Sequence, residues 1–171
     1  LADESVRLDT ARGEMGRGVT TGLATLLGEE LDVNPLDMDV RLAGAHEDYN
    51  NPLFGMQGTG GSSSTRAHFL PMRQAGANTR MLILQAAASD LGAEVAVLRT
   101  DNGHVVHAGK RFPYADFIES ASLLTIAADA PLKPAGEFQY IGRESRRVDA
   151  ISKSTGTADF GLDIDIPDLH Y

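Results

Sequence analysis

Two glycine-rich segments, each placed directly before a helical pattern, are the parts of this sequence best suited to binding chemistry. The first is Gly13-Glu14-Met15-Gly16-Arg17-Gly18, and the second runs through residues 55–65 and ends in glycines and small hydroxyl residues. Such segments build no core, but they can present successive backbone N–H groups and hydroxyls to an anion. A helix N-terminus adds partial positive charge at the same place. Together, the two segments predict an anion-binding site.

Two common phosphate-binding motifs do not match these segments. Gly16-Arg17-Gly18 lacks the third glycine of a dinucleotide-binding fingerprint, and residues 59–65 lack the Gly-Lys-Ser/Thr ending of a P-loop. These differences disfavour ordinary nucleotide hydrolysis. The residues also leave open a second interpretation, in which both segments are simply tight turns with good helix caps.

Hydrophobic periodicity predicts the elements that position the two segments. Alternation of apolar and polar residues predicts strands at residues 5–10 and 39–43, and helical spacing predicts a helix over 19–31. Residues 44–61 are expected to form a long loop, and loops of this length are usually either functional or disordered. A longer helix follows, from about residue 62 to about residue 91. Each glycine segment therefore lies where the chain enters a helix.

The remaining pattern predicts an α/β (α+β) fold with the start of a second module. Strands over 95–100 and 104–107 flank Asp101-Asn102-Gly103, which is typical of a hairpin turn, and a helix is expected over 113–126. We therefore expect a mixed sheet with a long helix, a hairpin and two to three helices. The predicted domain limits are 1–130 for the α/β domain, 131–137 for a Pro/Ala linker, and 138–171 for the opening of a second, β-rich and truncated domain.

The last segment carries two further expectations. A strand is predicted over residues 160–167, where apolar and acidic residues alternate. Because unpaired strand edges need partners, residues 138–171 should pack back on the first module, pair with another copy, or be mobile. In an amide-exchange measurement, we expect this segment to be weakly protected and its protection to rise with protein concentration.

Composition limits the classes of function. The chain has 171 residues, 42% of them apolar, which is enough for a sizeable core. A formal net charge of −9 disfavours nucleic acid as a partner. The lack of cysteine excludes disulfides and thiolate metal sites, and no apolar run approaches the roughly 18 residues of a membrane-spanning helix. Because the chain opens without Met and stops at His170-Tyr171, we expect it to be part of a longer polypeptide.

Several motifs, in their order and spacing, resemble the molybdenum-cofactor-binding large subunit of the xanthine oxidase family. They begin with the first glycine segment followed by Leu-Leu-Gly-Glu-Glu-Leu-Asp-Val, then Asn51-Pro52-Leu53-Phe54-Gly55, then residues 57–66. The similarity continues through Asp101-Asn102-Gly103, Lys110-Arg111-Phe112-Pro113-Tyr114, Tyr140-Ile141-Gly142-Arg143 and Phe160-Gly161-Leu162-Asp163-Ile164. It covers nearly the whole chain. Within the family, the motifs resemble the isoquinoline 1-oxidoreductase and membrane-associated aldehyde dehydrogenase type.

This resemblance implies a ligand and a reaction. Large subunits of the family hold a molybdopterin cytosine dinucleotide cofactor with molybdenum. They hydroxylate aldehydes or aromatic N-heterocycles with oxygen derived from water, and pass electrons to a small Fe–S partner subunit. The cofactor-binding positions carried over by the resemblance are Gly16, Arg17, Gly18, Thr59, Gly60, Gly61, Ser62, Ser63 and Ser64. The compartment stays open between the bacterial cytoplasm and periplasm.

The sequence departs from the family in two places. Arg17 occupies the position of the family's usual Gln; it adds positive charge and donors but cannot accept a hydrogen bond. The family's catalytic glutamate has no counterpart in this chain. No catalytic residue and no metal ligand are therefore predicted, and the chain by itself is expected to be inactive.

A hypothesis from a different class is a non-catalytic interaction or scaffold module whose glycine loops are purely structural.

Three further features are interpreted as non-functional or supporting. His46-Glu47-Asp48 is interpreted as a solvated acidic loop, and Arg146-Arg147 is too short a basic run to indicate function. Glu14 is expected to orient its loop rather than act as a general base. If the binding hypothesis holds, the two glycine loops should converge, so that one ligand meets both helix N-termini.

Overall fold

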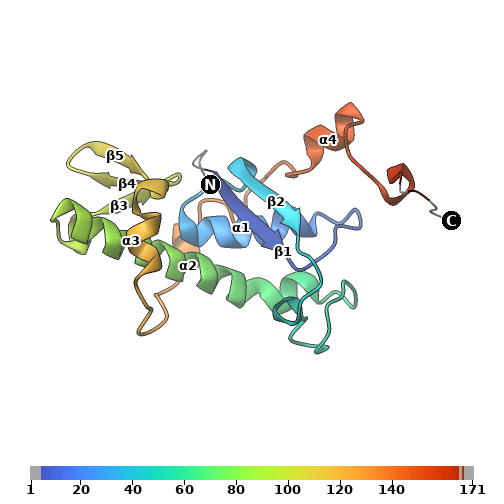
Figure 1. Ribbon diagram of the computed structural model, residues 1–171, viewed down its shortest axis with the longest axis horizontal. Coiled ribbons are helices and arrows are strands. Elements are labelled where there is room, and N and C mark those ends of the chain that lie inside the picture. The colour runs from blue at the N-terminus through green and yellow to red at the C-terminus, as the bar shows by residue number, and fades with distance from the viewer. Residues whose placement is uncertain (1–4, 166, 168–171) are drawn as a thin grey trace.

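A computed structural model describes residues 5–165 and residue 167 of the chain (Figure 1). Its helices and strands are, in chain order, β1 (Val6–Thr10), α1 (Val19–Leu31), β2 (Met38–Leu42), α2 (Ser64–Leu91), β3 (Arg99–Asp101), β4 (His104–His107), β5 (Lys110–Pro113), α3 (Ile118–Ser122) and α4 (Ala150–Thr155). Short 3-10 turns lie in several of the connections. Helices combined with short strands confirm the α/β class predicted from the sequence.

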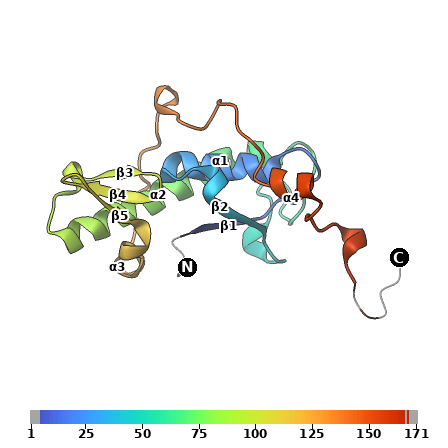
Figure 2. The same cartoon turned by 90° about the horizontal axis from the view of Figure 1, so that it is seen from above.

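The strands form two separate small sheets, so the expectation of one mixed sheet is wrong in this respect. β1 and β2 pair in parallel, with Val6 opposite Met38, and α1 connects them. β3, β4 and β5 form an antiparallel sheet beside the far end of α2 (Figure 1). α2 separates the two groups of strands in the chain, and they lie at different positions along that helix, so their edges do not pair (Figure 1). Figure 2 shows β1 and β2 on one side of the α1–α2 pair.

The region after β4 differs from the sequence prediction in having an additional strand and a shorter helix. Ala108 and Gly109 both have positive φ, 48° and 76°, and they reverse the chain into β5. The helix predicted over 113–126 is also shorter than expected. A 3-10 turn covers Tyr114–Phe117 and α3 ends at Ser122.

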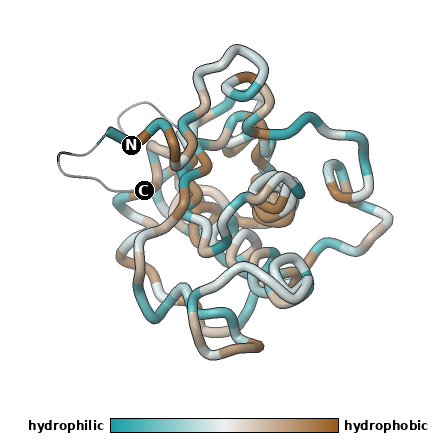
Figure 3. Tube along the Cα trace, turned by 90° about the vertical axis from the view of Figure 1, so that its right-hand side faces the viewer, coloured by the Kyte–Doolittle hydropathy of each residue, from teal (hydrophilic) through white to brown (hydrophobic). Residues whose placement is uncertain are grey.

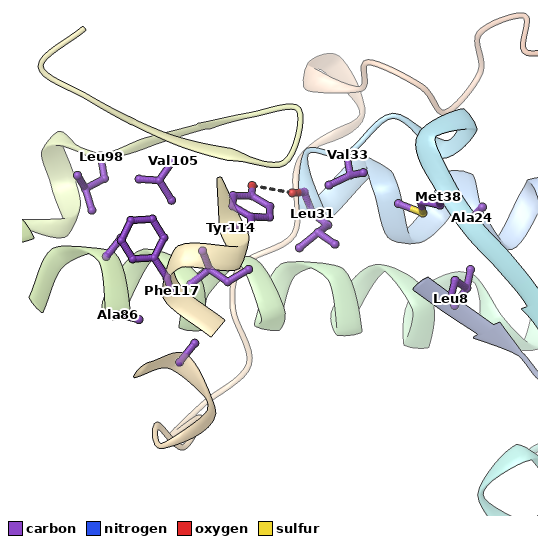
Figure 4. Close-up of a cluster of buried hydrophobic side chains, with 13 residues drawn as sticks. Leu8, Ala24, Leu31, Val33, Met38, Ala86, Leu98, Val105, Tyr114 and Phe117 are labelled. Atoms are coloured by element: carbon purple, nitrogen blue, oxygen red, sulfur yellow. Dashed lines mark hydrogen bonds between the residues drawn. The ribbon is translucent and has the colours of Figure 1, made fainter. Parts of the chain in front are cut away.

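The core lies between the two long helices, the parallel strands and the hairpin. Buried residues from all these elements meet in one cluster, including Leu8, Leu31, Met38, Val105 and Phe117 (Figure 4). In Figure 3, hydrophobic segments gather in the middle of the molecule, and several surrounding loops are hydrophilic. This burial is the main stabilising contribution to the fold.

A close backbone approach fixes how α1 lies on α2. A Cβ atom placed on Gly76 of α2 would stand 2.5 Å from the carbonyl oxygen of Leu27 in α1. At the end of α1, a Cβ on Gly28 would stand 2.4 Å from the carbonyl oxygen of Val33. Only glycine fits at these two positions without a shift of the backbone.

Two buried carboxylates of α1 hold parts of the predicted linker, 131–137, and of the predicted second module that follows it. Glu29, fully buried, accepts hydrogen bonds from the backbone N–H groups of Gln139, Tyr140 and Ile141, at 2.7–3.1 Å. Glu30, also fully buried, accepts from Arg73 at 2.6 and 2.8 Å. It accepts from the Lys133 N–H at 3.1 Å as well. Residues 133–141 are therefore bound to the first helix.

The rest of the predicted second module contains no strand among its described residues, 138–165 and 167. At the start of the strand predicted over 160–167, Gly161–Asp163 form a 3-10 turn instead. The Asp163 carboxylate accepts the Phe160 N–H at 2.9 Å and the Phe160 carbonyl accepts the Asp163 N–H at 2.8 Å, so local bonds replace strand pairing. Residues 166 and 168–171 lie outside the described part, and the domain limits at 130 and 138 stay predictions.

Candidate functional site

The two glycine loops converge, as expected from the sequence, at the N-terminal ends of α1 and α2. A shallow hollow of about 230 Å³ lies between them and is lined by Arg17, Gly18, Val19, Gly60, Ser62, Ser64 and Thr65. Figures 1 and 2 both place the loop after β1 and the loop before α2 at the same end of the helix pair. One ligand in this hollow would touch both loops.

The first loop is shaped by positive φ angles and one carboxylate. Gly16 and Gly18 have φ of 90° and 73°, and Gly18 is the N-cap of α1. The Glu14 carboxylate accepts hydrogen bonds from the N–H groups of Gly18, at 2.9 Å, and Thr20, at 3.3 Å. Burial raises the pKa of Glu14, but these N–H donors outweigh burial and leave the pKa below its ordinary value. Glu14 therefore orients the loop and stays ionised.

The second loop is shaped by a buried serine. Ser63, the N-cap of α2, is fully buried; its hydroxyl donates to the Gly60 carbonyl at 2.7 Å and accepts from Asn51 Nδ2 at 2.7 Å. The Ser63 side chain therefore does not cap the helix. Ser64 and Thr65, the first two residues of α2, line the hollow. The partial positive charge of this helix start consequently lies at the hollow.

Gly60 has no structural reason within the described chain to be glycine. Its φ is not positive, and a Cβ placed on it would meet no protein atom within 4 Å. A glycine of this kind leaves open space at the hollow that it lines. A side chain at this position would extend into open space and not onto atoms of the described protein.

Direct bonds tie the two loops together. The Gly13 N–H donates to Thr59 Oγ1 at 2.9 Å. Arg12, fully buried, donates to the carbonyl oxygens of Gly58, at 2.6 Å, and Tyr49, at 2.7 Å. The two loops thus form one unit with a guanidinium beneath it.

The predicted site residues fall into two groups. Five of them line the hollow: Arg17, Gly18, Gly60, Ser62 and Ser64. The other four shape the loops instead. Thr59 bonds Gly13, Ser63 bonds Asn51, Gly61 turns the chain with φ of 58° beside the Phe54 ring, and the Gly16 carbonyl accepts from Arg147.

Sequence reasoning missed several residues of the site. Val19 and Thr65 line the hollow as the first or second residue of a helix, which helix-start positions could have indicated. Arg12, Asn51 and Arg147 hold the loops through contacts that no local pattern marks. Within the described residues, no group of three or more His, Cys, Asp or Glu side chains is arranged to hold a metal ion.

Fold and site together define an α/β domain whose two glycine loops meet at paired helix starts. The chain matches the family model for the molybdopterin cofactor-binding domain over residues 1–162. It therefore belongs to this family, and the resemblance to the large subunits of the xanthine oxidase family is confirmed.

Individual relatives are similar over short parts of their length. The chain is 33% identical to a subunit of the nicotinate dehydrogenase of Pseudomonas putida, over 91% of this chain and 13% of that protein. It is 29% identical to the beta subunit of isoquinoline 1-oxidoreductase from Brevundimonas diminuta, over 99% of this chain and 26% of that protein. The crystal structure of quinoline 2-oxidoreductase from Pseudomonas putida 86 aligns with a TM-score of 0.47 and 20% identity, over 70% of this chain and 15% of that one. The chain thus spans about a quarter or less of these relatives.

The helices in the described part of the chain, α2 included, do not combine the length and the apolar character that crossing a membrane requires.

Proposed function

We propose that the hollow between the two glycine loops binds the phosphate-bearing part of a molybdopterin cofactor, in its cytosine dinucleotide form. The protein to which this domain contributes would hydroxylate aldehydes or aromatic N-heterocycles with oxygen from water. A small Fe–S subunit would accept the electrons. When bound, the cofactor supplies the metal at which the substrate is oxidised.

The convergence of both loops on one hollow carries this proposal. The donors at the hollow are those that a phosphate-bearing ligand requires: helix-start N–H groups, the hydroxyl residues Ser62, Ser64 and Thr65, and the Arg17 guanidinium. Gly18 and Gly60 leave space in which a Cβ would meet no protein atom within 4 Å. The residues present therefore fit an anionic cofactor.

Each part of the chain has a separate task in this function. Glu14 orients the first loop through its bonds to Gly18 and Thr20. The Asn51–Ser63 bond fixes the second loop. Arg17 brings a charge to the rim of the hollow, where a ligand phosphate would be bound by attraction and by direct donation.

If the two loops are purely structural, the residues tolerated at position 60 differ from those tolerated by a cofactor site. If the loops only cap helices, Gly60 could be any small residue, because nothing in the described protein occupies its Cβ position. If they bind a cofactor, a methyl group there would intrude on the ligand. This position therefore separates the two hypotheses.

The test compares Gly60→Ala with Gly136→Ala in the protein expressed in a host that makes the cofactor. Gly136 is a matched control, since its φ is not positive, its Cβ position is open, and it lies outside the hollow. We expect both variants to fold, and molybdenum and pterin per polypeptide to fall only in Gly60→Ala. Equal cofactor content in both variants, or no cofactor in the parent protein, would contradict the proposal.

A further inference from the structure

The first glycine loop is held by a residue from far along the chain, Arg147. Its Nη1 donates to the Gly16 carbonyl oxygen at 3.1 Å, and its Nη2 lies 3.5 Å from Glu14 Oε1. One guanidinium therefore contacts both the backbone and the orienting carboxylate of the same loop. The sequence alone indicated no role for Arg147, which belongs to a short basic pair.

Arg147 is itself fixed in place by its neighbours. Its Nε and Nη2 donate to the two carboxylate oxygens of Asp149, each at 2.7 Å, and Lys153 lies 2.7 Å from the same carboxylate. The Val148 N–H donates to Thr21 Oγ1 in the first turn of α1 at 3.1 Å. A forked pair of this kind restricts the rotamers of arginine, so little entropy is lost when Arg147 binds the loop.

The middle of the loop has few other anchors. In the described chain, the Arg147 bond to Gly16 is the only hydrogen bond that joins residues 15–17 to an element outside the loop and its helix. The bond from Gly13 to Thr59 holds the loop's beginning, and Glu14 holds its end at Gly18. The carbonyl of Gly16 thus depends on Arg147 for its position.

Arg147 also changes the charge that a ligand meets. The ionised Glu14 carboxylate lies at the start of α1, where it would repel a phosphate. The guanidinium near Glu14 offsets this charge. The Arg147 side chain is about a third exposed, at 36%, so it is accessible from the solvent side of the loop.

We propose that Arg147 is a positioning residue of the cofactor site, and that residues 147–149 complete that site although they follow the predicted linker. The role of Arg147 toward a cofactor rests on the proposed function. Its role in holding the glycine loop in place does not depend on that function. The glycine loop would keep its shape only while the segment after residue 138 is docked on α1.

The test uses Arg147→Gln, with Arg146→Gln as the matched control, in the full chain and in the cofactor-loaded protein. Arg146 is the neighbouring cation and is exposed. Without ligand, we expect amide exchange at Gly18 and Thr20 to become about tenfold faster in Arg147→Gln only, because a charged hydrogen bond is lost. Arg147→Lys should restore part of the protection, since it keeps the charge but not the fork. Exchange as slow as in the parent chain would overturn the positioning role.

Cofactor content provides the second measurement. We expect molybdenum and pterin per polypeptide to fall in Arg147→Gln, to stay unchanged in Arg146→Gln, and to recover partly in Arg147→Lys. A faster-exchanging loop with full cofactor content would overturn the role of Arg147 in the site. If even the parent protein held no cofactor, the proposed function would fail, whereas the exchange result would still decide whether Arg147 holds the loop.

Discussion

Arg12, which is fully buried, and His68, which is partly buried, form a polar pair beneath the second glycine loop. His68 Nδ1 lies 2.9 Å from the Ser64 carbonyl and must donate to it, so Nε2, 3.4 Å from Arg12 Nη2, is the acceptor. This arrangement requires a neutral imidazole. Burial first, and then the Arg12 charge, lower the pKa of His68, although the Ser64 carbonyl opposes them.

The lowered pKa of His68 predicts a pH dependence of stability. Between that pKa and the unfolded value of 6.5, the unfolded chain binds more protons than the folded one. The free energy of unfolding should therefore rise with pH through this window and level off above it. Urea unfolding across pH 5–8 measures the slope, which should be reduced in His68→Gln. An identical slope in the variant would show that His68 does not cause it.

Arg17 provides a second residue-scale prediction. It lines the hollow and is exposed, so its charge acts on a bound anion through solvent. Arg17→Gln should weaken retention of the cofactor, and the difference from the parent protein should shrink as salt is raised. Cofactor release followed by dialysis at low and high ionic strength measures this effect. Equal retention at low salt would exclude a role for the Arg17 charge.

At the scale of elements, the packing of α1 on α2 requires glycine at position 76, whereas position 22 has room for a larger residue. A Cβ on Gly76 would lie 2.5 Å from the Leu27 carbonyl oxygen, so the two helices would have to move apart. A Cβ on Gly22 in α1 would meet only Thr65 Oγ1, at 3.9 Å, which is an ordinary contact.

Alanine at these two helix positions should therefore have opposite effects. Gly76→Ala should destabilise the fold by about 1–3 kcal/mol through overpacking. Gly22→Ala should stabilise it by up to about 1 kcal/mol, because alanine has the higher helix propensity. Thermal and urea unfolding of both variants check the signs. Destabilisation of similar size in both would mean that close approach is not the reason for Gly76.

For the whole molecule, the buried carboxylate of Glu29 joins the C-terminal segment to the first helix. Burial raises the pKa of Glu29, but the N–H donors of residues 139–141 and the Lys133 charge outweigh burial and lower it. Docking of that segment should therefore be lost as pH falls through the lowered pKa, since the folded state holds the ionised form.

Glu29→Gln should loosen the C-terminal segment. The amide would place an N–H₂ group against backbone donors, leaving buried groups unsatisfied at a cost of about 1–3 kcal/mol. We expect faster amide exchange at residues 139–141 and, through the shared segment, at Gly18. Exchange measured by mass spectrometry on the full chain tests this. Unchanged exchange at 139–141 would contradict the role assigned to Glu29, and concentration-dependent protection there would favour pairing with another copy.

The sequence by itself determined the two glycine loops, both long helices, the hairpin turn and the class of the fold. These features are local: apolar residues at helical spacing, Asn-Gly in a turn, and glycines before a helix each act within a few residues. The family resemblance rested on the same local motifs, and it held.

Only the tertiary structure decided which loop residues face the hollow and what holds them there. Thr59 and Ser63 belong to the same run as Ser62 and Ser64, yet they bond Gly13 and Asn51 instead of lining the hollow. The Arg147 contact with Gly16 joins residues 131 positions apart. Such contacts are set by how the helices and segments pack, which periodicity and composition do not specify, so they could not be predicted from the chain alone.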